Sequence, residues 1–279
     1  MTKSKRVGEN SRPLALVAGV AALVLAALAA GCANRPDGQP GTGTQTDMVT
    51  TSDEPEARRR ARVRLELAVG YFEQGQTTVA LDELKQALVT DPSFSEAFNL
   101  RGLIYMRLND MRMAEDSFRR ALALNSRDPD THHNYGWLLC QQGRYSESIQ
   151  AFGQVLLHPT YGGRAKTLMA QGLCQVRAGQ LAEAERSLAR SYELDAGNPI
   201  TGYNLSNLLF QRNEFNRAQF YIRRLNNSEF ANAESLWLGV KVERRMNNRE
   251  AMMQLADQLR KRYPQSRELV AYEKGSFDE

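Results

Sequence analysis

The chain has 279 residues, and its 36 lysines and arginines slightly outnumber its 32 aspartates and glutamates. Residues 1–31 hold four of the basic and one of the acidic residues, which leaves 32 basic and 31 acidic residues in the remainder. Such a balance, with no aromatic-basic RNA motif and no zinc-finger spacing, argues against a nucleic-acid partner. We interpret short basic runs such as 58–60 as solvated helix faces.

Residues 1–31 have the composition of a secretory signal. Four basic residues precede an apolar run over 14–30, and Cys32 directly follows the sequence Leu-Ala-Ala-Gly. The segment resembles a bacterial lipoprotein signal, which implies cleavage before Cys32 and acylation of that cysteine. The family usually has leucine where Ala29 stands. An alternative is an uncleaved membrane helix, because 17 apolar residues reach the lower end of what spans a bilayer.

The lipoprotein resemblance implies a location as well. Ala33 stands where an aspartate commonly retains lipoproteins in the inner membrane, so we expect a lipid anchor at Cys32 on the periplasmic face of the outer membrane. Residues 32–57 are rich in Gly, Pro, Thr and Asp and poor in large apolar residues. This composition predicts a flexible linker.

A pattern of small and bulky residues then recurs. The spacings between the central small residues are 34, 34, 36, 34 and 33, at Ala80, Ala114, Ser148, Ala184, Ala218 and Ala251. Twelve residues before each stands another small residue, namely Ala68, Gly102, Gly136, Gly172, Ser206 and Gly239. Four residues after each stands a bulky apolar residue, namely Leu84, Phe118, Phe152, Leu188, Ile222 and Leu255. The period and the pattern resemble the tetratricopeptide repeat (TPR), a pair of antiparallel helices.

Residues between the two small residues of each repeat predict the turn that joins its two helices. Gly or Asn, which tolerate the left-handed conformation, stand at Gly75, Asn109, Gly143, Gly179 and Asn213. The sixth turn, near 246–248, is shifted by a residue or two, and an insertion falls in 159–163 between repeats three and four.

We therefore expect an all-α, right-handed superhelix (solenoid) of six TPR helix-turn-helix repeats over 58–266. The repeats are expected at about 61–94, 95–128, 129–162, 165–198, 199–231 and 232–266, with a C-terminal tail at 267–279.

No catalytic or metal-binding pattern stands out. The three histidines, His132, His133 and His158, form no HExxH or CxxC-type arrangement, and no phosphate-binding or nucleophile motif is present. We expect no enzyme activity, cofactor or metal. Cys140 and Cys174 lie late in the first helices of repeats three and four, so stacking brings them side by side. The two cysteines could form a disulfide in the oxidising periplasm, or they could remain as two buried free thiols.

In TPR arrays the first helices line the concave groove. Here these positions are largely apolar, which predicts a protein-binding groove for an amphipathic helix or an extended peptide. The predicted groove comprises Leu65, Val69, Phe72, Asn99, Leu103, Met106, His133, Trp137, Cys140, Met169, Leu173 and Val176, with Tyr203, Asn207, Phe210, Leu236 and Val240 in the last two repeats. Some of these side chains could instead fill the superhelix interior or pack beneath the tail.

Two segments indicate a more specific resemblance than the TPR pattern does. Residues 134–148, which read NYGWLLCQQGRYSES, and the ending 259–266, which reads LRKRYPQS, resemble repeats three and six of the type IV pilus biogenesis lipoproteins PilF and PilW, the pilotin family. The resemblance implies a monomeric, non-catalytic adaptor that binds the outer-membrane secretin subunit and promotes its localisation and multimerisation. Alternatives are a TPR lipoprotein of the barrel-assembly machinery and a periplasmic cell-wall enzyme scaffold.

Overall fold

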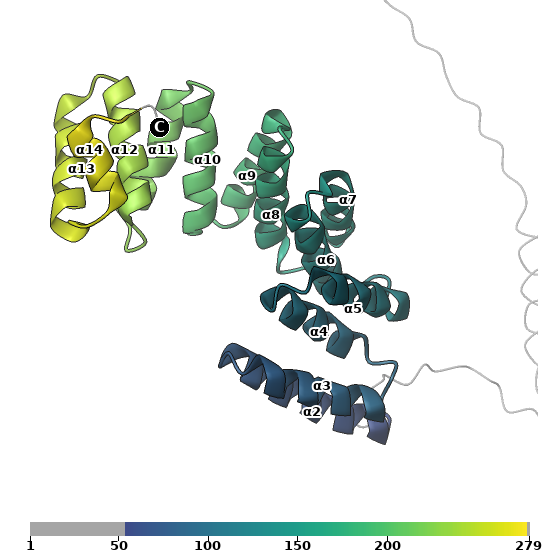
Figure 1. Cartoon of the computed structure of the whole chain (residues 1–279). Coiled ribbons are helices and arrows are strands. Elements are labelled where there is room, and N and C mark those ends of the chain that lie inside the picture. The colour runs from purple at the N-terminus through teal and green to yellow at the C-terminus, as the bar shows by residue number, and fades with distance from the viewer. Residues whose placement is uncertain (1–53, 278–279) are drawn as a thin grey trace, which may run out of the picture. The chain divides into compact units, whose positions relative to one another are not determined.

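The computed structural model describes residues 54–277, so the predicted signal, Cys32 and most of the predicted linker lie outside the described residues. Twelve helices of this range form six antiparallel pairs, each with a first helix (helix A) and a second helix (helix B) (Figure 1). The pairs are α2 (Glu56–Glu73) with α3 (Thr77–Thr90), α4 (Ser95–Arg107) with α5 (Met111–Leu124), α6 (Pro129–Gln141) with α7 (Tyr145–Leu156), α8 (Arg164–Arg177) with α9 (Leu181–Leu194), α10 (Pro199–Gln211) with α11 (Phe215–Asn226), and α12 (Ala233–Arg245) with α13 (Arg249–Arg262).

This arrangement is the all-helical TPR array that the sequence pattern predicts. Two boundaries differ from the expectation. Helix α2 begins at Glu56, inside the predicted linker, and a further helix, α14 (Arg267–Lys274), forms where only a tail was expected. Ser266 caps α14 by accepting a hydrogen bond from Leu269 N, and Gly275 ends it in the left-handed conformation.

The turn within each pair depends on one residue with a positive φ. The six are Gly75, Asn109, Gly143, Gly179, Asn213 and Asn247, with φ between 57° and 78°. In every pair, helix B begins two residues later. Asn247 lies eight residues after Gly239, whereas Asn109 lies seven after Gly102, so the sixth turn carries one additional residue.

The small residues let helix A approach helix B closely. A Cβ atom added at Gly102 would lie 2.5 Å from the Phe118 ring, and one at Gly136 would lie 2.9 Å from the Phe152 ring. The same clash would occur at Gly172, 2.7 Å from Leu188. Since Cβ contacts below 3.0 Å are excluded sterically, a larger residue at these three positions would displace the facing side chain or the helix that carries it.

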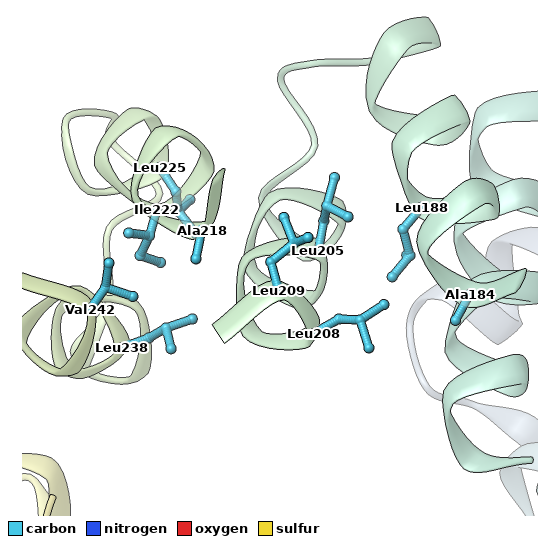
Figure 2. Close-up of a cluster of buried hydrophobic side chains, with 10 residues drawn as sticks. All are labelled: Ala184, Leu188, Leu205, Leu208, Leu209, Ala218, Ile222, Leu225, Leu238 and Val242. Carbon is cyan, nitrogen blue, oxygen red and sulfur yellow. The ribbon is translucent and has the colours of Figure 1, made fainter. Parts of the chain in front are cut away.

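Consecutive pairs share one apolar interior. Figure 2 shows the cluster that joins repeats four to six, with side chains from α9, α10, α11 and α12 meeting across the pair boundaries. Its fully buried members include Leu188, Leu209 and Ile222. A single repeat could not bury this surface, so each repeat is stabilised by its neighbours.

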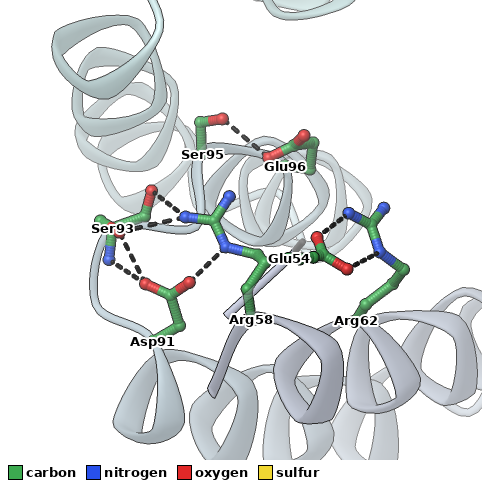
Figure 3. A network of polar contacts seen from close by, with 7 residues as sticks. All are labelled: Glu54, Arg58, Arg62, Asp91, Ser93, Ser95 and Glu96. Atoms are coloured by element: carbon green, nitrogen blue, oxygen red, sulfur yellow. Dashed lines mark hydrogen bonds and ion pairs between the residues drawn. The ribbon is translucent and has the colours of Figure 1, made fainter. Parts of the chain in front are cut away.

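A polar network secures the boundary between repeats one and two (Figure 3). Arg58 forms an ion pair with Asp91 and donates to the carbonyl oxygen of Ser93, while its guanidinium lies 4.7 Å from the centre of the Phe94 ring. The arginine and the donors of Ser93 lower the pKa of the Asp91 carboxyl. Asp91, at the end of the first repeat, thus connects α2 to the loop that leads into the second repeat.

The contacts between pairs place the A helices on the inner surface of the array. Each helix A contacts the next helix A, whereas no helix B within residues 54–277 contacts another helix B.

The described chain contains no helix with the length and apolar character needed to cross a bilayer.

Helix α14 covers the sixth repeat. It packs on α12 and α13, and Leu236 and Val240 are fully buried, with Leu269 and Ala271 of α14 in their clusters. These two side chains therefore do not line an open groove; they pack beneath the C-terminal tail, the alternative that the sequence analysis left open.

Candidate functional site

A cavity of about 370 Å³ opens on the helix A surface of repeats two to four. We call it the helix A pocket. Side chains from α4, α6, α8 and the start of α10 line it, namely Leu103, Met106, His133, Asn134, Trp137, Lys166, Met169, Ala170, Leu173 and Ile200. The lining is mostly apolar, with a few polar groups, which is the composition of sites that bind a bulky side chain.

The pocket brings together six of the residues predicted from sequence. These are Leu103, Met106, His133, Trp137, Met169 and Leu173, contributed by three successive repeats. Each repeat supplies side chains one or two helical turns apart, so the stacking of the repeats creates one continuous surface. Asn134, Lys166, Ala170 and Ile200 were missed, although their spacing of three or four residues from predicted members could have indicated them.

The other predicted groove residues lie elsewhere. Leu65 and Phe72 pack against the core of repeats one and two, and Val69 is 38% exposed. Val176, Tyr203 and Phe210 pack against the core cluster of repeats four to six, where they are half-buried. None of these residues lines the helix A pocket.

The two predicted asparagines of the groove, Asn99 and Asn207, do not line the pocket. Asn99 accepts a hydrogen bond of 3.0 Å from Asn134 Nδ2, which links α4 to α6 beside the cavity. Asn207, from repeat five, is half-buried and lies outside the pocket lining.

A disulfide lies behind the pocket wall. The structure joins Cys140 of α6 to Cys174 of α8, with Cα atoms 5.8 Å apart, inside the range that disulfides require. Both cysteines are buried and pack with Ala170 and Trp137, two residues of the lining. Cys140 is therefore not part of the open groove, where the sequence analysis had placed it. The bond connects repeats three and four at the base of the pocket.

His133 is the titratable group most altered by this environment. Its side chain is buried, and its Nδ1 donates to Thr167 Oγ1 at 2.9 Å, because that hydroxyl in turn donates to the carbonyl oxygen of Gly163. Burial, with a smaller effect of the Lys166 charge, lowers the pKa of His133 to about 4. The imidazole is therefore neutral at pH 7 and contributes an uncharged wall to the pocket.

With the array and the pocket described, comparison with known proteins identifies related chains. Two models of the tetratricopeptide repeat family match residues 65–130 and 117–150. The type IV pilus assembly protein PilF of Pseudomonas aeruginosa is 28% identical over 232 residues, which cover 83% of this chain and 91% of PilF. An uncharacterized protein of Haemophilus influenzae is 27% identical over 48% of this chain and 75% of its own length.

Solved structures of the same two pilus proteins, PilW and PilF, are similar to this structure. The crystal structure of PilW, described as a widely conserved type IV pilus biogenesis factor, has a TM-score of 0.70 and 28% identity, and the match covers 76% of this chain and 97% of PilW. The structure of Pseudomonas aeruginosa PilF has a TM-score of 0.72 and 25% identity over 79% of this chain and all of PilF. The similarity extends over the repeat array as a whole.

The thiols of Cys140 and Cys174 provide a first prediction. In protein unfolded in urea without reductant, we expect neither thiol to react with an alkylating reagent, because both sulfur atoms are bonded. Mass spectrometry should show two additional alkyl groups only after reduction. Two alkylated cysteines at these positions in the unreduced sample would contradict the disulfide.

The lowered pKa of His133 predicts a loss of stability in mild acid. The unfolded chain binds a proton near pH 6.5 and the folded chain only near pH 4, so protons favour the unfolded state between these values. The contribution of this group is complete above pH 6.5 and falls by roughly 1 kcal/mol per pH unit as the pH is lowered.

Urea unfolding of the wild type and His133→Asn at several pH values measures this effect. Carboxylate titrations are common to both proteins and cancel in the difference. The free energy of unfolding should fall more steeply for the wild type than for the variant between pH 6.5 and 4. Parallel curves would show that His133 does not titrate as expected.

Proposed function

We propose, because the chain belongs to the PilF and PilW family of type IV pilus assembly proteins, that it is an adaptor that binds the outer-membrane secretin subunit and promotes its localisation and multimerisation. The observation that carries this proposal is an apolar pocket spanning three repeats of an array that aligns with PilF and PilW over most of its length. The similarity to pilus proteins favours this function over barrel assembly or cell-wall scaffolding.

The mechanism follows from location and binding. The helix A pocket would hold a bulky apolar side chain of one secretin segment, and the neighbouring A helices would contact the residues on either side of it. Trp137, Leu103 and Leu173 offer the large apolar surface that dominates the energy of protein interfaces. No bond is made or broken, so the adaptor acts by keeping the subunit at the membrane.

The anchor completes the proposal. Acylation of Cys32 would attach the chain to the periplasmic face of the outer membrane, and residues 33–53 would connect the anchor to α2. Several acyl chains on one residue bind a bilayer far more firmly than one. The lipid would therefore carry the repeat array, together with a bound secretin subunit, to its site of assembly.

Substitutions in the pocket test the adaptor role. Leu173→Asn should weaken binding of the purified periplasmic region of the secretin by roughly 30-fold, because it removes apolar contact of about 2 kcal/mol. Phe220→Ala is the matched control, since Phe220 is a large apolar residue of α11 that is 61% exposed away from the pocket. Thermal melting should confirm that both variants fold.

The same variants can be tested in cells. Secretin multimers in outer-membrane fractions should decrease with Leu173→Asn and remain with Phe220→Ala. If deletion of the whole gene left the multimers and the surface pili unchanged, the proposed function would be wrong.

Replacement of the anchor residue tests location separately. Cys32→Ala should move the protein from the outer-membrane fraction to the periplasmic fraction, because no acyl group can then be attached. Gradient fractionation with immunodetection measures the shift, and Cys140→Ala is the control because it also removes a cysteine. Continued outer-membrane residence of Cys32→Ala would exclude lipidation as the cause of localisation.

A further inference from the structure

Cations lie over the aromatic rings of the helix A surface in a repeating manner. The guanidinium carbon of Arg107 lies 4.9 Å from the centre of the Phe72 ring, and that of Arg177 lies 5.2 Å from the Trp137 ring. Each cation belongs to the repeat that follows its ring. Cation–π contact holds these charges against the apolar surface rather than away from it in solvent.

The cations beside the helix A pocket have no carboxylate partner among residues 54–277. Lys166 lines the pocket and forms no ion pair there. Arg177 contacts Trp137 and, at 3.9 Å, the Sγ atom of Cys140, but no acidic group. The charge of Lys166 already acts on the pocket, because it contributes to the low pKa of His133.

One acidic residue opposes this charge, since Asp130 raises the pKa of His133, but by less than Lys166 lowers it. Helices α8 and α10 contain no aspartate or glutamate, whereas α8 carries Arg164, Lys166 and Arg177. Asp130, at the start of α6, accepts a hydrogen bond from the Tyr161 hydroxyl. The side of the pocket formed by α8 is therefore apolar and positively charged at the same time.

A segment that fills this pocket would remove water from the neighbouring cations. A neutral or basic segment would leave Lys166 and Arg177 partly desolvated without a counter-charge, which is unfavourable. A carboxylate beside each cation would pair with it in a medium of reduced polarity, where such a contact is stronger than in water.

We infer that the segment bound in the helix A pocket combines a bulky apolar side chain with a nearby aspartate or glutamate for each of Lys166 and Arg177, which lie toward opposite ends of α8. The inference rests on the proposed adaptor function and specifies the chemistry of the partner at that site. The apolar side chain supplies the buried contact, and the carboxylates select the segment and speed its association.

Binding of the purified periplasmic region of the secretin at two salt concentrations tests the inference. Lys166→Gln/Arg177→Gln should weaken binding by roughly tenfold at 50 mM NaCl, which corresponds to two partly exposed charge contacts. The wild type should bind more weakly at 300 mM than at 50 mM NaCl, and this difference should largely vanish in the double variant.

Lys85→Gln/Arg112→Gln is the matched control, because it removes the same two charges from α3 and α5, outside the helix A pocket. It should change the affinity less than twofold. Lys166→Gln alone should weaken binding about threefold, and within residues 54–277 it removes no hydrogen bond and no ion pair, so a loss caused by misfolding can be distinguished. Melting curves of every variant verify the fold.

The outcomes separate the two proposals. If the wild type does not bind, or if Leu173→Asn leaves binding unchanged, the proposed function fails. If the wild type binds and Leu173→Asn weakens it, but the double charge variant binds equally or more tightly, the acidic partner segment is refuted.

Discussion

Close approach of helix A to helix B is the constraint on which the rest of the structure depends. Glycine at 102, 136 and 172 leaves no room for a Cβ atom against Phe118, Phe152 and Leu188. Each bulky side chain therefore fills the volume that the missing side chain leaves, and the pair becomes a unit of fixed geometry. Because the other repeats also have a small residue at this position, namely Ala68, Ser206 and Gly239, the units stack on one another, and their A helices come to lie side by side.

The binding surface is a consequence of that stacking. Leu103, Trp137 and Leu173 lie on three different repeats, and the pocket they line exists only when these repeats are in contact. The Cys140–Cys174 disulfide connects two of the three directly behind the lining. An adaptor benefits from such a base, because a rigid surface loses little conformational freedom when a partner binds. At the other end of the array, α14 closes the inner surface and leaves the pocket in the middle repeats.

The environment of the pocket also explains how one surface can be both apolar and selective. Burial keeps His133 neutral, so the wall of the pocket does not repel an apolar side chain. Lys166 and Arg177 place positive charge at the edge, where a partner's carboxylate could reach it. In the proposed complex, apolar contact would provide affinity and the charges would provide selection between segments, in accordance with the ordinary division of roles at protein interfaces.

The sequence alone determined the helix pairs, their turns and the positions of close approach, because each of these depends on residue size or backbone freedom at a fixed offset. Gly75, Asn109 and Asn213 were recognisable as turns, since few residues other than Gly and Asn adopt a positive φ without strain. Only the tertiary structure decided which helix A side chains remain accessible. Val240 follows Gly239 as Leu103 follows Gly102, yet α14 buries Val240 while Leu103 lines the pocket, and nothing in the local pattern encodes a cover contributed by a later segment. The local pattern also did not predict that Lys166 and Ile200 line the pocket. Their positions depend on the rotation between neighbouring repeats, which is set by packing across the whole interface.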